Sequence, residues 1–227
     1  MCQKIRVAII DDHQSIIDGY IFRLSDMPDI EVVATANVGE ALERMLAECD
    51  VDVLLLDVTV PTSEDNANPY PILHLVPQLL QTYPELVILV MSMHAQRSLI
   101  RGVVEAGVSG YILKDDYASI RELGSIVRSV AGGGIHFSQQ AHAQLLRGSQ
   151  EDETLTPRQR EALSLAAAYP DLTAAQLAKR LEIAHSTVRN LLSGAYLRLG
   201  VRNRSAAVAR ARSLGLITPY DPTVDTT

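Results

Sequence analysis

The stretch from Val51 to Asp57, VDVLLLD, decides how the rest of this chain is organised. It is a short apolar run that ends in a carboxylate, a pattern that predicts a strand buried on both faces rather than a helix. In an open parallel sheet, the carboxyl ends of the strands form the floor of the crevice where ligands bind. Taken alone, an Asp in this place is more often a cap on the following turn. Further polar residues at other strand ends favour a ligand site.

Composition indicates a chain that buries more than one core. At 227 residues, with 47% apolar and 4% aromatic residues, it is long enough for two domains. Its apolar runs are too short to cross a bilayer, and its start, MCQKIRVAIIDD, is unlike a secretory signal. The only cysteines, Cys2 and Cys49, form no metal or disulfide pattern. We therefore expect a cytoplasmic protein without membrane contact.

The net charge of -7 conceals a difference between the two halves. Residues 154–217 carry ten Lys and Arg against three acids, whereas residues 1–153 carry ten against 22 acids. An acidic half joined to a basic half indicates two tasks, the basic one involving a polyanion.

The first half alternates strand and helix patterns. Strands are expected at 4–10, 30–36, 51–57, 86–92 and 110–114, with helices between them and a last helix at 119–131. The polar loop TVPTSEDNANPYP follows the third strand and delays the next helix to about Ile72. Five strands separated by helices predict an α/β fold, a doubly wound, flavodoxin-like parallel sheet.

Polar side chains end four of these strands, namely Asp11 with Asp12, then Asp57, Ser92 and Lys114. Three carboxylates at one edge of a sheet repel one another, and a hard divalent cation such as Mg²⁺ would relieve that repulsion. A carboxylate beside the ion can attack a phosphoryl group and form an acyl phosphate. Lys114 and Ser92 would then stabilise the oxygens of the transferred group.

The motifs IIDDH, VLLLD, VMSMH and GYILKD resemble those of a two-component receiver domain, over residues 1 to about 130. The resemblance implies that Asp57 is the phosphoacceptor, that Ser92 is the switch hydroxyl and that Lys114 contacts the phosphoryl group. It also implies that Tyr111 turns inward when Ser92 moves, although a half-buried strand aromatic is the ordinary alternative. Mg²⁺ would be held by Asp11, Asp12, Asp57 and the backbone carbonyl of Thr59.

The loop after Asp57 departs from that family. Pro61 is followed by several extra residues and by no Gly before the next helix. A tolerated surface loop is one explanation. A shield over the site, a change in access for the kinase, or a contact with a partner are others.

The second half opens with LTPRQREAL, in which Thr156, Pro157 and Gln159 form a helix start with a capping box. Further helices are expected from Thr173, from Ser186 or Thr187 to Gly200, and at 205–214. Two short helices joined by a tight turn on a basic background predict a helix-turn-helix that enters the DNA major groove. The expected domains are 1–131, a linker with a short helix at 132–153, the DNA-binding domain at 154–217 and a tail at 218–227.

Three segments, LTPRQREAL, LAKRLEIAHSTVRN and RLGVRNRSAAVARA, resemble the LuxR-type helix-turn-helix of NarL/FixJ response regulators. Gln176, Leu191 and Gly194 depart from that pattern. Arg189 is the clearest candidate for a base or phosphate contact, with a solvated helix charge as the alternative. The expected DNA-binding residues are Thr187, Arg189, Asn190, Ser193, Arg202 and Arg204.

Together the two resemblances imply a phosphorylation-controlled transcription regulator rather than an enzyme. A sensor histidine kinase would load Asp57, and a homodimer would bind double-stranded DNA. The resemblance also implies that the unphosphorylated receiver covers the recognition helix. Two alternatives stay open. One is an atypical regulator controlled by a ligand or protein partner, and the other is an aspartyl-phosphate phosphatase, against which Thr59 argues because those enzymes usually place an acid there. Kinase, promoter, direction of regulation and dimer interface are not identified by the sequence.

Overall fold

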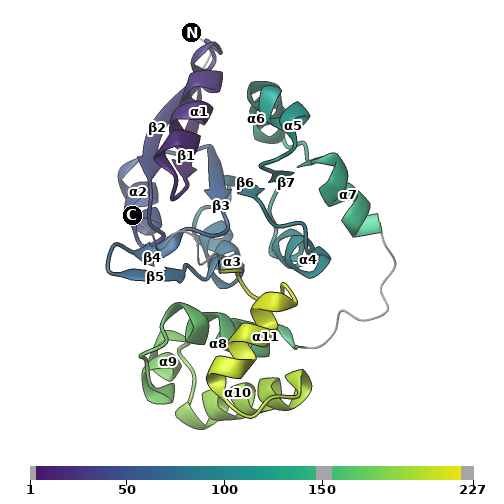
Figure 1. The fold of residues 1–227 in the computed structure, drawn as a ribbon. Helices are drawn as coiled ribbons and strands as arrows, with labels where there is room; N and C mark the ends of the chain where they lie inside the picture. The colour runs from purple at the N-terminus through teal and green to yellow at the C-terminus, as the bar shows by residue number, and fades with distance from the viewer. Residues whose placement is uncertain (1–3, 147–154, 221–227) are drawn as a thin grey trace.

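The structure, a computed structural model, describes residues 4–146 and 155–220, which form an α/β domain and a helical domain (Figure 1). Most of the expected tail, and residues 147–153 of the expected linker, lie outside the described residues. Within the described residues, no helix combines the length and apolar character needed to cross a membrane.

The α/β domain is built on a parallel sheet with strand order β2-β1-β3-β6-β7-β8. The strands are β1 Ile5–Ile10, β2 Ile30–Ala36, β3 Val53–Asp57, β6 Val87–Ser92, β7 Gly110–Leu113 and β8 His136–Phe137. All five residues of β3 are buried, as a central strand covered on both faces requires. The doubly wound fold is confirmed, with six strands in the sheet rather than the five expected.

Helices cover both faces of this sheet (Figure 1). Val7 and Ile9 of β1 face the layer that contains α1 Gln14–Ser25 and α6 Leu123–Ala131. Ala8 and Ile10 face the layer of α2 Ala41–Glu48, α3 Ile72–Thr82 and α4 Arg97–Glu105. Alternate residues of one strand therefore supply two cores. The last helix expected in this half is divided at Glu122 into α5 Tyr117–Arg121 and α6.

Residues 132–146, assigned from the sequence to a linker, belong structurally to this domain. Strand β8 pairs with β7 through Gly110 opposite His136 and Tyr111 opposite Phe137. The expected short helix is present as α7 Gln139–Leu146, which packs against α4 and β7. The sequence did not predict β8, because a two-residue strand leaves almost no pattern of alternating residues.

The extra residues after Asp57 form an antiparallel hairpin of β4 Pro61–Ser63 and β5 Asn66–Pro69. The hairpin is held on the start of α2, where Gly39 N–H donates to the Pro61 carbonyl at 2.8 Å and Glu40 N–H donates to the Thr62 carbonyl at 2.9 Å. The Tyr70 ring lies so close to Gly39 that a Cβ there would come within 2.1 Å of the ring.

The helical domain contains α8 Pro157–Ala168, α9 Ala174–Arg180, α10 His185–Leu199 and α11 Arg204–Ser213. The expected capping box of Thr156 and Gln159 is present, and Thr173 and Gln176 form a second one. The helix α10 begins one or two residues before the expected cap, with Ala184 at the N-cap position. Its interior side chains join one core with those of α8, α9 and α11.

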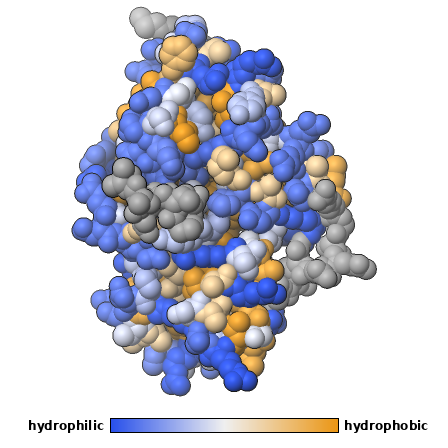
Figure 2. All heavy atoms as spheres, viewed as in Figure 1, coloured by the Kyte–Doolittle hydropathy of each residue, from blue (hydrophilic) through white to orange (hydrophobic). Residues whose placement is uncertain are grey.

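The two domains contact each other through α8, which lies against α3 and the β4–β5 hairpin. Asn66 Nδ2 donates to the Ala168 carbonyl at 2.9 Å, and His74 Nδ1 lies 3.1 Å from Glu161 Oε1. The Ser98 hydroxyl donates to the Leu214 carbonyl beyond α11. In Figure 2 the surface of both domains is mostly hydrophilic, with apolar side chains gathered on the helical domain.

Candidate functional site

The carboxyl ends of β1 and β3 and the residue after β7 bring Asp11, Asp57 and Lys114 together. The Lys114 ammonium lies 2.7 Å from Asp11 Oδ2 and 2.8 Å from Asp57 Oδ2. The two carboxylate side chains are 1% exposed and the lysine is 8% exposed. The predicted convergence of these strand ends therefore occurs, and Lys114 bridges the two acids.

Burial and crowding shift the ionisation of this pocket. Burial, together with the charge of Asp57, raises the pKa of Asp11 to about 6, against the opposing effect of Lys114. Burial opposes the charge of Lys114, yet the two carboxylates raise its pKa above the ordinary value. The pocket thus holds more negative charge than one ammonium neutralises, a condition that favours a further cation.

Asp12 offers an oxygen for such a cation. Its Oδ2 atom is buried and has no hydrogen-bond partner among the described residues, while Oδ1 lies 2.7 Å from His13 Nδ1. Ligand atoms of Asp11, Asp12 and His13 all lie within 4.8 Å of one another. Hard oxygen donors at this spacing fit Mg²⁺. His13, which the sequence did not single out, places a ring nitrogen beside these oxygens and is not among the expected Mg²⁺ ligands.

Thr59 contacts Asp57 from the following turn. Its N–H donates to Asp57 Oδ1 at 3.3 Å and its hydroxyl donates to Asp57 Oδ2 at 3.1 Å. These contacts fix the carboxylate in the pocket. The expected role of the Thr59 carbonyl as a metal ligand stays a prediction.

Ser92 and Tyr111, the expected switch residues, both contact His94. Ser92 Oγ accepts a hydrogen bond from His94 N–H at 3.1 Å, and Tyr111 Oη donates to the His94 carbonyl at 2.6 Å. Both side chains are fully buried. Tyr111 therefore points inward in this structure, and its expected role as a switch residue stays a prediction.

The expected DNA-reading residues on α10, namely Thr187, Arg189, Asn190 and Ser193, are all exposed. On the other side of the helix, Val188, Leu192 and Ala195 are buried in the domain core. The expectation that the receiver covers the recognition helix is not met here, because the receiver packs on α8 and on the residues after α11.

Arg202 and Arg204 differ in orientation. Arg202 is exposed, but the Arg204 guanidinium turns inward and donates to the carbonyls of Leu172 at 2.6 Å, Ala166 at 2.9 Å and Tyr169 at 2.9 Å. It thereby satisfies carbonyls at the end of α8. This geometry argues against the expected contact of Arg204 with the DNA backbone.

A buried acid pocket on a doubly wound sheet, joined to a helix-turn-helix, defines a signal-receiving regulator of transcription. The chain belongs to the response regulators of the NarL/FixJ type: residues 7–123 match the response regulator receiver domain, and residues 153–199 match sigma-70, region 4.

Relatives of known function span nearly the whole chain. The DNA-binding transcriptional activator DevR/DosR of Mycobacterium tuberculosis is 31% identical, over 92% of this chain and 95% of that protein. The transcriptional regulatory protein MctR of Rhizobium johnstonii is 28% identical, over 94% of this chain and 96% of its own. Both relatives are regulators of transcription, which favours regulation of transcription over the phosphatase alternative.

Solved structures share the fold. RcsB from Salmonella enterica serovar Typhimurium, bound to promoter rprA in the presence of phosphomimetic BeF3-, matches with a TM-score of 0.64 and 22% identity, covering 92% of this chain and 98% of that one.

Proposed function

We propose that this regulator binds DNA under the control of phosphorylation at Asp57. The observation that carries the proposal is the buried Asp57 carboxylate, held by the Lys114 ammonium at 2.8 Å and by the Thr59 hydroxyl at 3.1 Å. A sensor histidine kinase or a small phosphodonor would supply the phosphoryl group. The receiver match, which implies a kinase partner, supports this source.

Asp11, Asp12, Asp57 and the Thr59 carbonyl would hold Mg²⁺. When bound, the ion would neutralise charge that develops on the transferred phosphoryl group. The buried, unpartnered Asp12 Oδ2 supports this assignment. Lys114, already placed between the two acids, would pair with a phosphoryl oxygen on Asp57.

Ser92 and Tyr111 would carry the signal away from Asp57. The Ser92 hydroxyl would donate to a phosphoryl oxygen and give up the hydrogen bond that it accepts from His94 N–H. Because Tyr111 donates to the carbonyl of the same residue, movement at His94 would reach the tyrosine through a single residue. The β4–β5 hairpin, which begins four residues after Asp57 and contacts α8, offers a second route to the DNA-binding domain.

The exposed face of α10 would read DNA, with Thr187, Arg189, Asn190 and Ser193 toward the groove and Arg202 toward the backbone. A homodimer on two half-sites would add to the affinity of one domain. A solved RcsB structure that holds two dimers bound to two parallel DNAs supports a dimeric DNA-bound form.

The experiment combines intact-mass measurement of phosphorylation by acetyl phosphate and Mg²⁺ with mobility shift on random DNA pools. We expect wild type to gain one phosphoryl group and to bind DNA more tightly afterwards. Asp57→Asn should gain no phosphoryl group. Asp115→Asn, at the exposed aspartate that follows Lys114 in the sequence, should behave as wild type. A wild-type protein that stays unlabelled contradicts the proposal.

A regulator that acts without phosphorylation is the second candidate. The exposed reading face of α10 favours it, since DNA could reach this face in the docked arrangement. In that case wild type and Asp57→Asn would shift the same DNA sequences to the same extent, with or without phosphodonor.

A further inference from the structure

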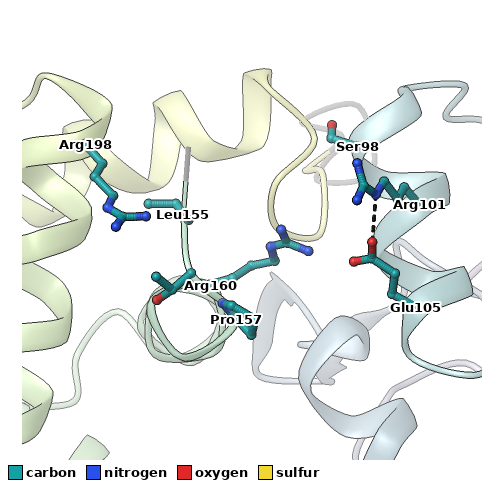
Figure 3. A pocket seen from close by; sticks show the side chains of 8 residues that line it. Ser98, Arg101, Glu105, Leu155, Pro157, Arg160 and Arg198 are labelled. Atoms are coloured by element: carbon teal, nitrogen blue, oxygen red, sulfur yellow. Dashed lines mark hydrogen bonds and ion pairs between the residues drawn. The ribbon is translucent and has the colours of Figure 1, made fainter. Parts of the chain in front are cut away.

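A cavity of about 300 Å³ lies between the two domains, at the start of α8 (Figure 3). The receiver contributes Arg101 and Glu105 from α4, and the DNA-binding domain contributes Arg160 from α8 and Arg198 from α10. We call these four residues and the space between them the arginine cleft. None of the four takes part in the phosphorylation site.

The arginine cleft has an excess of positive charge. Its one carboxylate, Glu105, already accepts from Arg101 Nε at 2.7 Å. Arg160 and Arg198 therefore add two guanidinium charges without a matching acid in the lining. Thr156 and Pro157, at the first turn of the twelve-residue α8, also line the space, so the positive end of that helix adds to the field.

Among the four residues of the arginine cleft, Arg160 is the one with a buried nitrogen that has no hydrogen-bond partner among the described residues. It is half-buried, and its Nε atom is buried without a hydrogen-bond acceptor among the described residues. Figure 3 shows its side chain reaching from α8 toward α4. Its Nη1 atom would lie 3.5 Å from a Cβ placed on Gly102, so the guanidinium crosses to the receiver. A buried N–H donor without an acceptor costs free energy, and an anion in the arginine cleft would supply the acceptor.

We propose that the arginine cleft binds a small phosphate-bearing molecule or free phosphate. A tetrahedral group can present oxygens to several guanidiniums at once, and each guanidinium can donate two parallel hydrogen bonds. A volume of about 300 Å³ suits a small metabolite. Because the lining comes from both domains, the bound anion would stabilise the docked arrangement and link it to ligand concentration.

The test uses the full-length chain and calorimetric titration with inorganic phosphate and, separately, glycerol phosphate, at an ionic strength held constant with sodium chloride. We expect saturable binding to wild type. Arg160→Gln and, independently, Arg198→Gln should each weaken it about tenfold or more, since each removes charge-assisted hydrogen bonds. Tighter binding of glycerol phosphate than of phosphate would identify a metabolite as the ligand; equal binding would identify the free anion.

Two arginines serve as matched controls. Arg158 lies on the same helix but is exposed and paired with Glu161 at 2.8 Å, so Arg158→Gln should bind as wild type does. Arg210→Gln, at an exposed position of α11 outside the cavity lining, should also bind phosphate as wild type does. Absence of saturable binding to wild type would overturn the proposal. Equal binding by wild type and both cleft variants, with circular dichroism showing folded proteins, would overturn it as well.

Discussion

Lys114 is the residue on which the metal-free pocket depends, since its ammonium lies between the buried carboxylates of Asp11 and Asp57. Replacing one partner of a buried ionic cluster leaves an uncompensated charge. For Lys114→Met in the absence of metal we therefore expect a loss of about 3 kcal/mol in the free energy of unfolding. Denaturant titration measures this loss, and added Mg²⁺ should restore part of it because the ion supplies the missing positive charge.

Lys4→Met is the matched control. Lys4 is half-exposed and lies 3.5 Å from Glu31, a surface pair that contributes little. If both lysine variants lose the same stability, or if Mg²⁺ restores neither, then the charge of Lys114 does not stabilise the pocket.

Arg204 is a second residue whose contribution to stability can be tested by substitution. Because its guanidinium donates to three carbonyls near the end of α8, Arg204→Ala should reduce the free energy of unfolding of the helical domain by about 2 kcal/mol. Arg202→Ala, at an exposed position, should leave stability unchanged and weaken DNA binding instead. Thermal melting followed by salt-dependent DNA titration separates the two effects. Equal melting of both variants would argue against the structural role of Arg204.

The sequence predicts residues at strand ends well, because topology alone brings Asp11, Asp57 and Lys114 to one edge of the sheet. It does not predict where a guanidinium turns. Arg202 and Arg204 are two residues apart on the same basic segment, and only the position of the α8 carbonyls decides that one is exposed and the other half-buried.

At the scale of elements, the β4–β5 hairpin is the main departure from expectation. Its sequence contains Pro at both ends and Asn at two positions, a composition typical of a loop. The hairpin forms because Pro61 and Thr62 offer carbonyls to the N–H groups at the start of α2. Such a contact is tertiary, so no local pattern could have predicted it.

Asn66 tests whether the hairpin holds the domains together. Its side chain donates to the Ala168 carbonyl at 2.9 Å and also accepts from Asn68 N–H at 3.1 Å. Asn66→Ala should loosen docking, seen as a wider distribution of distances between fluorophores on the two domains, without unfolding the receiver. Glu64→Ala, in the exposed turn of the same hairpin, should not change that distribution. An unchanged distribution of distances for Asn66→Ala would show that the hairpin does not hold the two domains together.

For the whole molecule, the arrangement of the domains rests on a few polar contacts. The His74 side chain is 7% exposed and that of Glu161 is 20% exposed where they meet. The remaining contacts include main-chain carbonyls of Ala168 and Leu214, which any residue could supply. This is why the sequence predicts both domains but not how they pack, nor that the reading face of α10 is left open.

The His74–Glu161 pair predicts a pH dependence of docking. The hydrogen bond from His74, with help from Arg158, lowers the pKa of Glu161 below its usual 4.5. The docked state therefore favours the ionised carboxylate. The contribution of the ionised Glu161 carboxylate to the free energy of docking is present above pH 4.5. It is lost as pH falls through the lowered pKa of Glu161. Energy transfer between fluorophores on the two domains, followed as pH falls below 4.5, should show separation in wild type.

Glu161→Gln is the control for this effect, because an amide cannot titrate. The variant should dock more weakly at neutral pH and lose this component of the acid response, while circular dichroism confirms that both domains stay folded over the range used. An identical acid response in wild type and variant would assign the pH dependence to other groups.

The short strand β8 has a practical consequence for anyone who wishes to isolate the receiver. Truncation near residue 131 would remove the partner of β7 and the two bonds at Ser138, whose N–H donates to the Tyr111 carbonyl at 3.0 Å and whose Oγ accepts from Leu113 N–H at 3.2 Å. A fragment cut there would expose the unpaired edge of β7 beside Tyr111 and would tend to self-associate. A fragment that runs to Leu146 would keep β8 as the edge strand and α7 packed against β7.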